Sequence, residues 1–333
     1  MWKLLLVLYC LLTLTGCEKP QVTTGASGTT AARQKITFAL TTQPQSTLVH
    51  IALKNGYFSD QGLDVQPLVH SFGKAALQSL LDGKANFATV AETPIMFSIL
   101  RGDRIFVVAN IESSTTNDAV MARVDAGITK PADLKGKRIG FSPGTTSDFF
   151  LDSFLTAQGL TRQDITPVPL KPDEMLDALL TKKADAVSTW NYPLTQIRRK
   201  LGTQAVTFYD RQIYTETFNI AATQDFVRQN PQVVTSVLRA LVRAEEFVSS
   251  HADESQDILA AAIKVDKDLI KEVWDAFSYQ VRLDQNLPIT LEDETRWAMK
   301  NKLTDQAVMP NYLSYIYVDG LKAVKPGAVR MDR

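Results

Sequence analysis

The sequence predicts an α/β protein built from two lobes. Strand-like and helix-like segments alternate from Ile36 onward in two successive cycles, and a nearly all-helical remainder follows them. The 333 residues also exceed what one hydrophobic core usually supports, which is about 250–300 residues. We therefore expect two α/β lobes and a helical tail.

The first cycle pairs short apolar strands with helices that end near glycines. Strands are expected over residues 35–40, 62–69, 85–91 and 104–111, and helices over 47–56, 73–83 and 93–102. Leu77, Leu80 and Leu81 recur at helical spacing before Gly83, and Pro94 stands in the first turn of its helix.

The second cycle repeats this order. The segment 132–142 is expected to run from a helical turn into a strand, and a helix that ends at Gly159 follows it. Further strands are expected over 165–170, 184–189 and 205–209, and further helices over 172–183 and 192–202. A strand over 217–222 precedes the helical tail, which we place on the first lobe. The chain would then cross between lobes near 118–123 and near 216–221. Paired crossings form a hinge, and closure would enclose a ligand between the lobes.

The N-terminus has the layout of a secretory signal. Lys3 precedes an apolar run over 4–14, which is too short for a membrane-spanning helix of about 20 residues. The Leu-Thr-Gly-Cys sequence at 14–17 resembles a bacterial lipobox, in which the peptide is cut before the cysteine and the thiol carries lipid; an ordinary signal peptide is the alternative. We expect a signal peptide over 1–16, a lipidated Cys17 and a flexible tether through residue 35, rich in small and polar residues.

Composition argues against several functions. Only Cys17 remains once Cys10 leaves with the signal, so we expect no disulfide, no thiolate catalysis and no cysteine-ligated metal. Acidic and basic residues balance, without the basic surplus typical of nucleic-acid binding. The histidines do not have metal-site spacing, and no P-loop or dinucleotide turn occurs. We therefore expect no cofactor, no metal and no nucleic-acid partner.

Four segments resemble successive motifs of one family. They read NGYFSDQGLDV, LLDGKANFATVAETP, DLKGKRIGFSPGTTSDFFLDSFLTAQGL and ADAVSTWNYP, and the resemblance runs from about Ile36 to Pro193. The chain resembles the periplasmic solute-binding proteins of ABC importers, in the branch for nitrate, sulfonates, taurine and thiamine pyrimidines (NMT1/THI5-like). Members commonly carry Trp-Glu-Pro where this chain has Trp-Asn-Tyr-Pro at 190–193.

The resemblance implies a two-lobed periplasmic-binding-protein fold of type II, each lobe a mixed sheet flanked by helices. Lobe one would comprise 36–122 and 217–333 with the helical tail, and lobe two 123–216. A monomer is expected in the cell envelope, tethered through Cys17 and facing the periplasm, or the exterior of a single-membrane bacterium. It would deliver its ligand to an ABC permease and the ATPase of that permease.

An alkanesulfonate or taurine-like compound is the favoured ligand. Three alternatives are a pyrimidine or other flat neutral precursor, a ligand-sensing lipoprotein without transport, and an enzyme. The motifs contain no credible nucleophile–base pair. Pyrimidine-forming relatives of the branch depend on a cysteine-rich motif, which this chain lacks, so we do not expect an enzyme.

Candidate ligand residues follow the ends of predicted strands, where ligands collect in open α/β sheets. They are Thr42, Gln43, Phe72, Gly73, Glu92, Thr93, Thr145, Thr146, Ser147, Trp190, Asn191 and Phe218. The residues at 145–147 begin a helix. Either the first N–H groups of this helix bind an anionic oxygen of the ligand, or the threonines only cap the helix. The three aromatic residues either stack on a ligand or pack in the core. Glu92 either pairs with an amine or caps the helix entered through Thr93.

Overall fold

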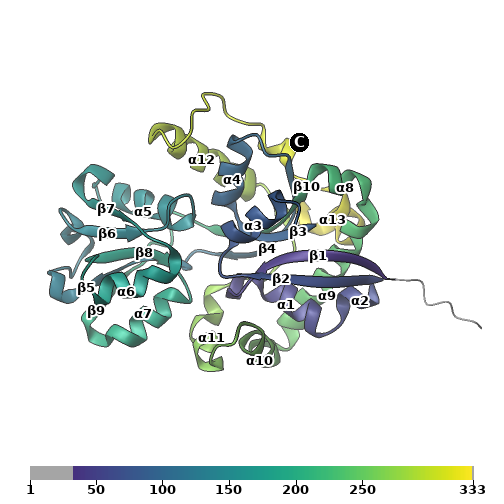
Figure 1. Cartoon of the computed structure of the whole chain (residues 1–333), viewed down its shortest axis with the longest axis horizontal. Coiled ribbons are helices and arrows are strands. Elements are labelled where there is room, and N and C mark those ends of the chain that lie inside the picture. The colour runs from purple at the N-terminus through teal and green to yellow at the C-terminus, as the bar shows by residue number, and fades with distance from the viewer. Residues whose placement is uncertain (1–32, 332–333) are drawn as a thin grey trace, which may run out of the picture. The chain divides into compact units, whose positions relative to one another are not determined.

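The computed structural model describes residues 33–331 (Figure 1). The predicted signal peptide, Cys17 and nearly all of the tether lie outside these residues. The first strand begins at Gln34, two residues before the expected boundary at Ile36.

Two five-stranded sheets within residues 33–331 carry the fold. The first has the order β2(Leu63–His70), β1(Gln34–Thr41), β3(Phe87–Ala91), β10(Glu216–Thr223), β4(Ile105–Ser114). The second has the order β7(Thr166–Pro169), β6(Arg138–Phe141), β8(Ala186–Trp190), β5(Asp118–Arg123), β9(Ala205–Phe208). These sheets confirm the predicted α/β fold class.

Both sheets share one pairing scheme. In the first, β1 pairs in parallel with β2 and β3, while β10 runs antiparallel between β3 and β4. In the second, β6 pairs in parallel with β7 and β8, while β5 runs antiparallel between β8 and β9. The connections at 115–117 and 209–215 join the two sheets, and each leads into an inserted antiparallel strand.

Helices cover the sheets in chain order. Those of the first cycle are α1(Thr47–Lys54), α2(Tyr57–Asp60), α3(Gly73–Leu81) and α4(Glu92–Leu100), and those of the second are α5(Thr146–Ala157), α6(Met175–Leu180) and α7(Pro193–Leu201). The tail contributes α8(Gln224–Gln229), α9(Pro231–Ser250), α10(Ala252–Ile263), α11(Lys267–Val273), α12(Asn286–Lys300) and α13(Asp319–Val324). A short pair, β11(Leu283–Asp284) and β12(Val329–Arg330), lies within the tail.

The tail packs on the first sheet and its helices, as Figure 1 shows for α9 and α13. The long α9 contacts α1, α2, β2 and β4, α12 contacts α4, and α13 contacts α9 and β4. The second sheet keeps a smaller core of its own, which includes Met121, Val187 and Leu194. In the part of the chain that the structure describes, every helix is too short or too polar to cross a membrane.

Candidate ligand-binding cleft

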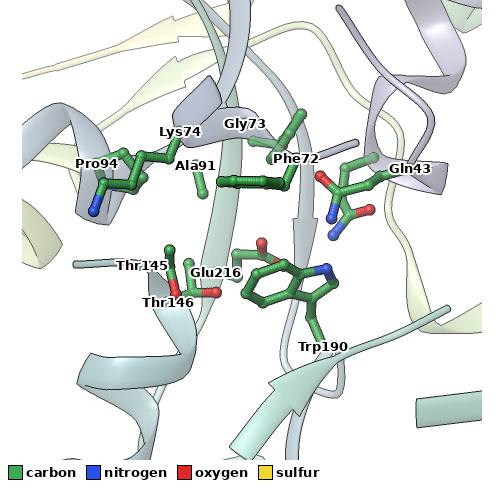
Figure 2. Close-up of a pocket in the computed structure, with 12 residues that line it drawn as sticks. Gln43, Phe72, Gly73, Lys74, Ala91, Pro94, Thr145, Thr146, Trp190 and Glu216 are labelled. Atoms are coloured by element: carbon green, nitrogen blue, oxygen red, sulfur yellow. The ribbon is translucent and has the colours of Figure 1, made fainter. Parts of the chain in front are cut away.

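A pocket with about 290 Å³ of empty volume lies between the two sheets (Figure 2). Its lining comes from strand ends and the turns that follow them, and consists of Gln43, Gln45, Phe72, Gly73, Lys74, Ala91, Pro94, Thr145, Thr146, Trp190, Glu216 and Phe218. This volume includes open solvent, and only about 20 Å³ of it can hold the centre of a water molecule, little more than the roughly 10–15 Å³ that one water needs. A ligand larger than a few atoms would therefore require the two sides of the pocket to move apart.

The pocket brings together seven residues that the sequence analysis named: Gln43, Phe72, Gly73, Thr145, Thr146, Trp190 and Phe218. Thr42 instead lines a neighbouring depression that also contains Trp190. Thr93 is buried and donates to Oε1 of Glu294 on α12. Asn191 contacts the connection between the sheets, through its backbone N–H to Asn117 and its amide to the carbonyl of Thr116.

Glu92 does not line the pocket. It begins α4, is 0% exposed, and accepts hydrogen bonds from the Tyr214 hydroxyl and from the backbone and hydroxyl of Thr217. These contacts tie α4 to the segment that re-enters the first sheet. Burial outweighs the hydrogen bonds and raises the pKa of Glu92 to about 7.

Aromatic side chains form two sides of the pocket. Figure 2 shows Phe72, from the turn after β2, on the opposite side from Trp190, which ends β8. Trp190 is 5% exposed, so most of its indole is packed while part of it faces the pocket. At Gly73, an added Cβ would lie 3.0 Å from the Cα of Val90, so a larger residue would push the start of α3 away from β3.

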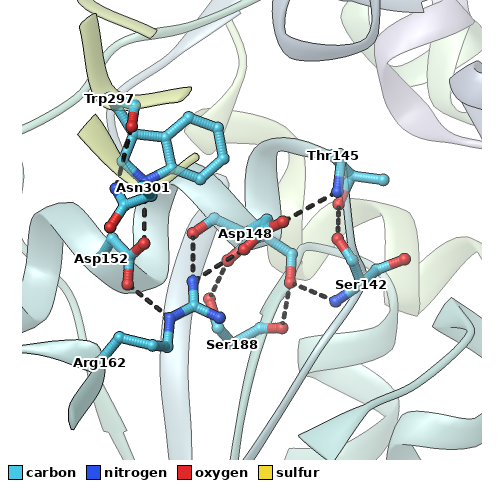
Figure 3. Close-up of polar contacts among 10 residues, drawn as sticks. Ser142, Thr145, Asp148, Asp152, Arg162, Ser188, Trp297 and Asn301 are labelled. Atoms are coloured by element: carbon cyan, nitrogen blue, oxygen red, sulfur yellow. Dashed lines mark hydrogen bonds and ion pairs between the residues drawn. The ribbon is translucent and has the colours of Figure 1, made fainter. Parts of the chain in front are cut away.

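The start of α5 forms another part of the lining. Gly144 has φ +67°, a conformation that favours glycine, and it turns the chain into the helix. The Thr145 hydroxyl donates to the Ser142 carbonyl at 2.7 Å, and the Thr146 hydroxyl donates to Oδ1 of Asp118 at 3.0 Å (Figure 3 shows the first contact). Both hydroxyl protons are therefore engaged within the protein. The first N–H groups of the helix, which have no intrahelical acceptor, are the donors left for a ligand.

Ser147 faces inward from the same turn. Its hydroxyl donates to the carbonyl of Ser188 at 2.7 Å and accepts from the backbone N–H of Ser142 at 3.0 Å. Ser147 thereby fixes α5 on β8. Lys74, at the start of α3, donates from Nζ to the carbonyl of Pro143 at 2.9 Å, which joins the first-sheet side of the pocket to the turn before α5.

Five buried carboxyl groups lie at and behind the pocket: Glu92, Glu112, Asp118, Glu216 and Glu294. Burial holds the pKa of each above its ordinary value, and repulsion from neighbouring carboxylates adds to this effect for Glu112, Asp118, Glu216 and Glu294. Of these, Glu216 lines the pocket. The charges of Asp118, Glu112 and Glu92 add to burial in raising its pKa.

Sequence reasoning did not name five of the lining residues as candidates: Gln45, Lys74, Ala91, Pro94 and Glu216. Gln45 stands two positions after Gln43 beyond the first strand, and Glu216 opens the second crossing, so both occupy places where candidates were sought. Burial of a charged residue such as Glu216 leaves no local pattern. Within residues 33–331, no group of three or more His, Cys, Asp or Glu residues is arranged to hold a metal ion.

Residues 43–255 match the family model described as NMT1/THI5 like. The chain belongs to this family. All the lining residues of the pocket fall inside the matched range. Family membership places the chain among the periplasmic solute-binding proteins of ABC importers, in the branch whose members are named for sulfonates, nitrate and thiamine biosynthesis. The predicted family and general function are confirmed.

Similar proteins extend the family assignment. A relative from Brucella abortus, named only as a binding protein, is 28% identical over 231 residues, which is 67% of this chain and 69% of the relative. One from Bacillus subtilis, named for aliphatic sulfonates, is 25% identical over 254 residues, with 75% and 76% covered. The crystal structure of the periplasmic aliphatic sulphonate binding protein SsuA from Escherichia coli superposes with a TM-score of 0.73 at 17% identity, covering 85% of this chain and 97% of that one. The last likeness shows the periplasmic-binding-protein fold.

The Trp-Asn-Tyr-Pro sequence at 190–193, which departs from the Trp-Glu-Pro motif of the family, has an unusual backbone conformation. Tyr192, the added residue between Asn191 and Pro193, adopts φ 84° and ψ −62°, which is rare for a residue other than glycine. It lines the depression next to the pocket together with Thr42 and Trp190. Strained backbone of this kind concentrates at functional sites in proteins.

Proposed function

We propose that this protein is the lipid-anchored receptor of an ABC importer and that it captures a small organic sulfonate in the pocket. The pocket is supplied from both sheets, so a ligand held there would favour the closed arrangement of the lobes. The observation that carries the sulfonate assignment is the start of α5, where Thr145 and Thr146 line the pocket and the first N–H groups of the helix have no intrahelical acceptor. The names of the Bacillus subtilis and Escherichia coli proteins support the same ligand class.

The lipid anchor rests on the sequence at 14–17 and on the tether behind it. One acyl chain anchors a protein only marginally, whereas lipobox proteins typically carry several. Full-length protein expressed in bacteria should therefore fractionate with membranes. Replacement Cys17→Ala should release it to the soluble fraction or block its maturation, and unchanged membrane retention of a mature chain would contradict the anchor.

The ligand class is tested by thermal unfolding of the chain from Lys35 onward with methanesulfonate, ethanesulfonate, taurine, nitrate and pyrimidines. A ligand at 100 times its dissociation constant stabilises the folded state by about 2.7 kcal/mol, which gives a readable shift. A shift with a sulfonate supports the proposal. The intrinsic fluorescence of Trp190 offers a second readout, and Trp190→Phe should remove the ligand-dependent part of the signal.

A flat pyrimidine is the second candidate, because Phe72 and Trp190 face the pocket from opposite sides. Aromatic faces stack on flat rings, and each such contact contributes about 1 kcal/mol beyond the buried area. The variants Phe72→Leu and Trp190→Leu separate the two candidates. Both should weaken a pyrimidine strongly but a small alkanesulfonate only slightly, since the sulfonate relies on the α5 start.

Transport and sensing share the same pocket and differ in the partner. Uptake of the identified ligand by cells that carry the receptor, with and without its permease, distinguishes them. Loss of uptake on deletion of the receptor supports the importer. Normal uptake combined with loss of a transcriptional or motile response would support a sensor.

A further inference from the structure

Several acceptor oxygens at the pocket have no donor. Gln45 lines the pocket, is 1% exposed, and its Oε1 has no hydrogen-bond partner among the residues that the structure describes. Asp118 is 3% exposed; its Oδ1 accepts from Thr146, a lining residue, while its Oδ2 has no partner within the same described range. A buried acceptor left unpaired costs about 1–3 kcal/mol, so such groups normally meet a donor.

Glu216 adds a carboxylate to the same part of the pocket. One oxygen accepts from the amide of Asn117, and the residue lines the pocket beside Thr146. Among the lining residues, Lys74 is the cation, and its amine is already directed at the carbonyl of Pro143. Figure 2 places the Lys74 amine at one end of the labelled set and Trp190 and Gln43 at the other, with Glu216 between.

We infer that Gln45, Asp118 and Glu216 form an ammonium subsite, which selects ligands that carry a primary amine or another cationic nitrogen. An ammonium group offers three donors and no acceptor, which complements a carbonyl and two carboxyl groups that offer acceptors. The inference rests on the proposed function, since the amine is part of the imported ligand. It applies equally to an aminoalkanesulfonate and to a pyrimidine with an aminoalkyl substituent, because both carry an alkylamine that is protonated at neutral pH.

Charge supports the same assignment. Burial raises the pKa of both Asp118 and Glu216, because no cation compensates them in the ligand-free pocket. A cation brought against them would lower both pKa values again. Ligand binding should therefore release protons from the protein, which calorimetry detects as a dependence of the binding enthalpy on the ionisation enthalpy of the buffer.

Matched ligand pairs test the subsite. Taurine and isethionate differ only in an amine against a hydroxyl, and 4-(aminomethyl)pyrimidine and 4-(hydroxymethyl)pyrimidine form a second such pair. Calorimetry and thermal unfolding are run with all four on the chain from Lys35 onward. We expect the amine member of the pair that binds to bind at least about tenfold more tightly, because truncating one side of a buried charge pair costs at least that factor. We also expect proton release with that member alone.

Variants assign the preference to the named residues. Glu216→Gln and Gln45→Met both preserve the size of the side chain. Glu216→Gln should reduce the preference for the amine ligand by about tenfold or more, and Gln45→Met should reduce it severalfold. Glu294→Gln is the matched control. It removes a buried carboxyl that accepts from Thr93 and does not line the pocket, so it should leave the amine preference unchanged. Thermal unfolding of each variant without ligand establishes that it is folded.

The outcomes separate this inference from the proposed function. Equal binding of taurine and isethionate would overturn the ammonium subsite and leave the sulfonate receptor standing. Binding of 4-(aminomethyl)pyrimidine alone would overturn the sulfonate assignment and support the subsite. If neither amine compound binds at millimolar concentration, the ammonium subsite is overturned. Tighter isethionate binding at lower pH would also overturn it, since protonated carboxyl groups would then be donating to the sulfonate.

Discussion

The indole Nε1–H of Trp297 donates to Oδ2 of Asp152 at 2.8 Å and thereby joins α12, which packs on α4, to α5 (Figure 3). The Trp297 ring also meets Phe149 of α5 and Phe97 of α4 edge-on, with centroids 5.4 and 5.9 Å apart. One side chain thus contacts helices from both sides of the pocket. It joins the two sides of the pocket at a point outside the residues that line it, where it would hold a closed arrangement of the lobes.

Trp297→Phe should remove the hydrogen bond and retain an aromatic ring. Asp152 keeps its second partner, Nε of Arg162 at 2.6 Å, so no buried charge is orphaned. We expect ligand to dissociate at least about tenfold faster, because a hydrogen bond to a charged group contributes about 1.5–3 kcal/mol and affinity changes appear mostly in dissociation. Stopped-flow fluorescence measures the rate. An unchanged rate would show that this contact does not hold the lobes closed.

A second connection between the two sides is exposed and should matter less. Glu272 of α11 accepts from Nη1 of Arg198 at 2.9 Å and from Nε of Arg199 at 3.1 Å, both on α7. Glu272 is 31% exposed and the arginines more so. Exposed ion pairs contribute about 0.2–1 kcal/mol and are screened by salt. Glu272→Gln should therefore change the dissociation rate less than Trp297→Phe does, and high salt should abolish the difference from wild type. An effect larger than that of Trp297→Phe would reverse this ranking.

Local sequence patterns account for much of the fold and part of the pocket. Apolar strands bounded by glycine and proline are encoded over a few residues each, so β1, β3 and β8 could be located along with the residues that follow them. Gln43, Phe72 and Trp190 were found in this way, because ligand sites lie at the ends of strands in such sheets.

The remaining features depend on residues far apart in the chain. The strand β5 was missed because its apolar run is only four residues long between the charged Asp118 and Arg123, and its pairing partners β8 and β9 come more than 60 residues later. Glu92 was assigned either to an amine or to a helix cap, yet its partners Tyr214 and Thr217 are 122 and 125 positions away. Contacts at this separation leave no periodic signal in one sequence.

The backbone of Tyr192 predicts an inverted order of stability for two substitutions. A residue other than glycine at φ 84° and ψ −62° costs about 1–3 kcal/mol, whereas glycine adopts such angles freely. Tyr192→Gly should therefore be more stable than Tyr192→Ala by about 1 kcal/mol, although glycine is ordinarily the less stable of the two. Urea unfolding with equal m-values measures the difference. An alanine variant as stable as the glycine variant would mean that the turn relaxes once the ring is removed.

The buried carboxyl groups predict that the ligand-free protein loses stability as pH rises. Glu92 has an ordinary pKa of 4.5 and a folded-state pKa of about 7, so between these values the folded chain holds a proton that the unfolded chain has released. Its contribution is complete below the unfolded pKa and is lost as pH rises through the folded pKa. A pKa that burial raises from 4.5 to about 7 corresponds to a loss of about 3 kcal/mol of stability across this pH range. The raised pKa values of Glu112, Asp118, Glu216 and Glu294 act in the same direction.

Urea midpoints between about pH 5 and pH 8 test this slope, and Glu92→Gln is the informative variant. The glutamine keeps an acceptor for Thr217 but does not titrate, so the variant should lose part of the pH dependence and should be closest to wild type at the acidic end. A control at an exposed acid, Asp257→Asn, should leave the slope intact. A wild-type protein that gains stability over this range would show that the buried cluster is ionised in the folded state, which requires a cation beside it even without ligand.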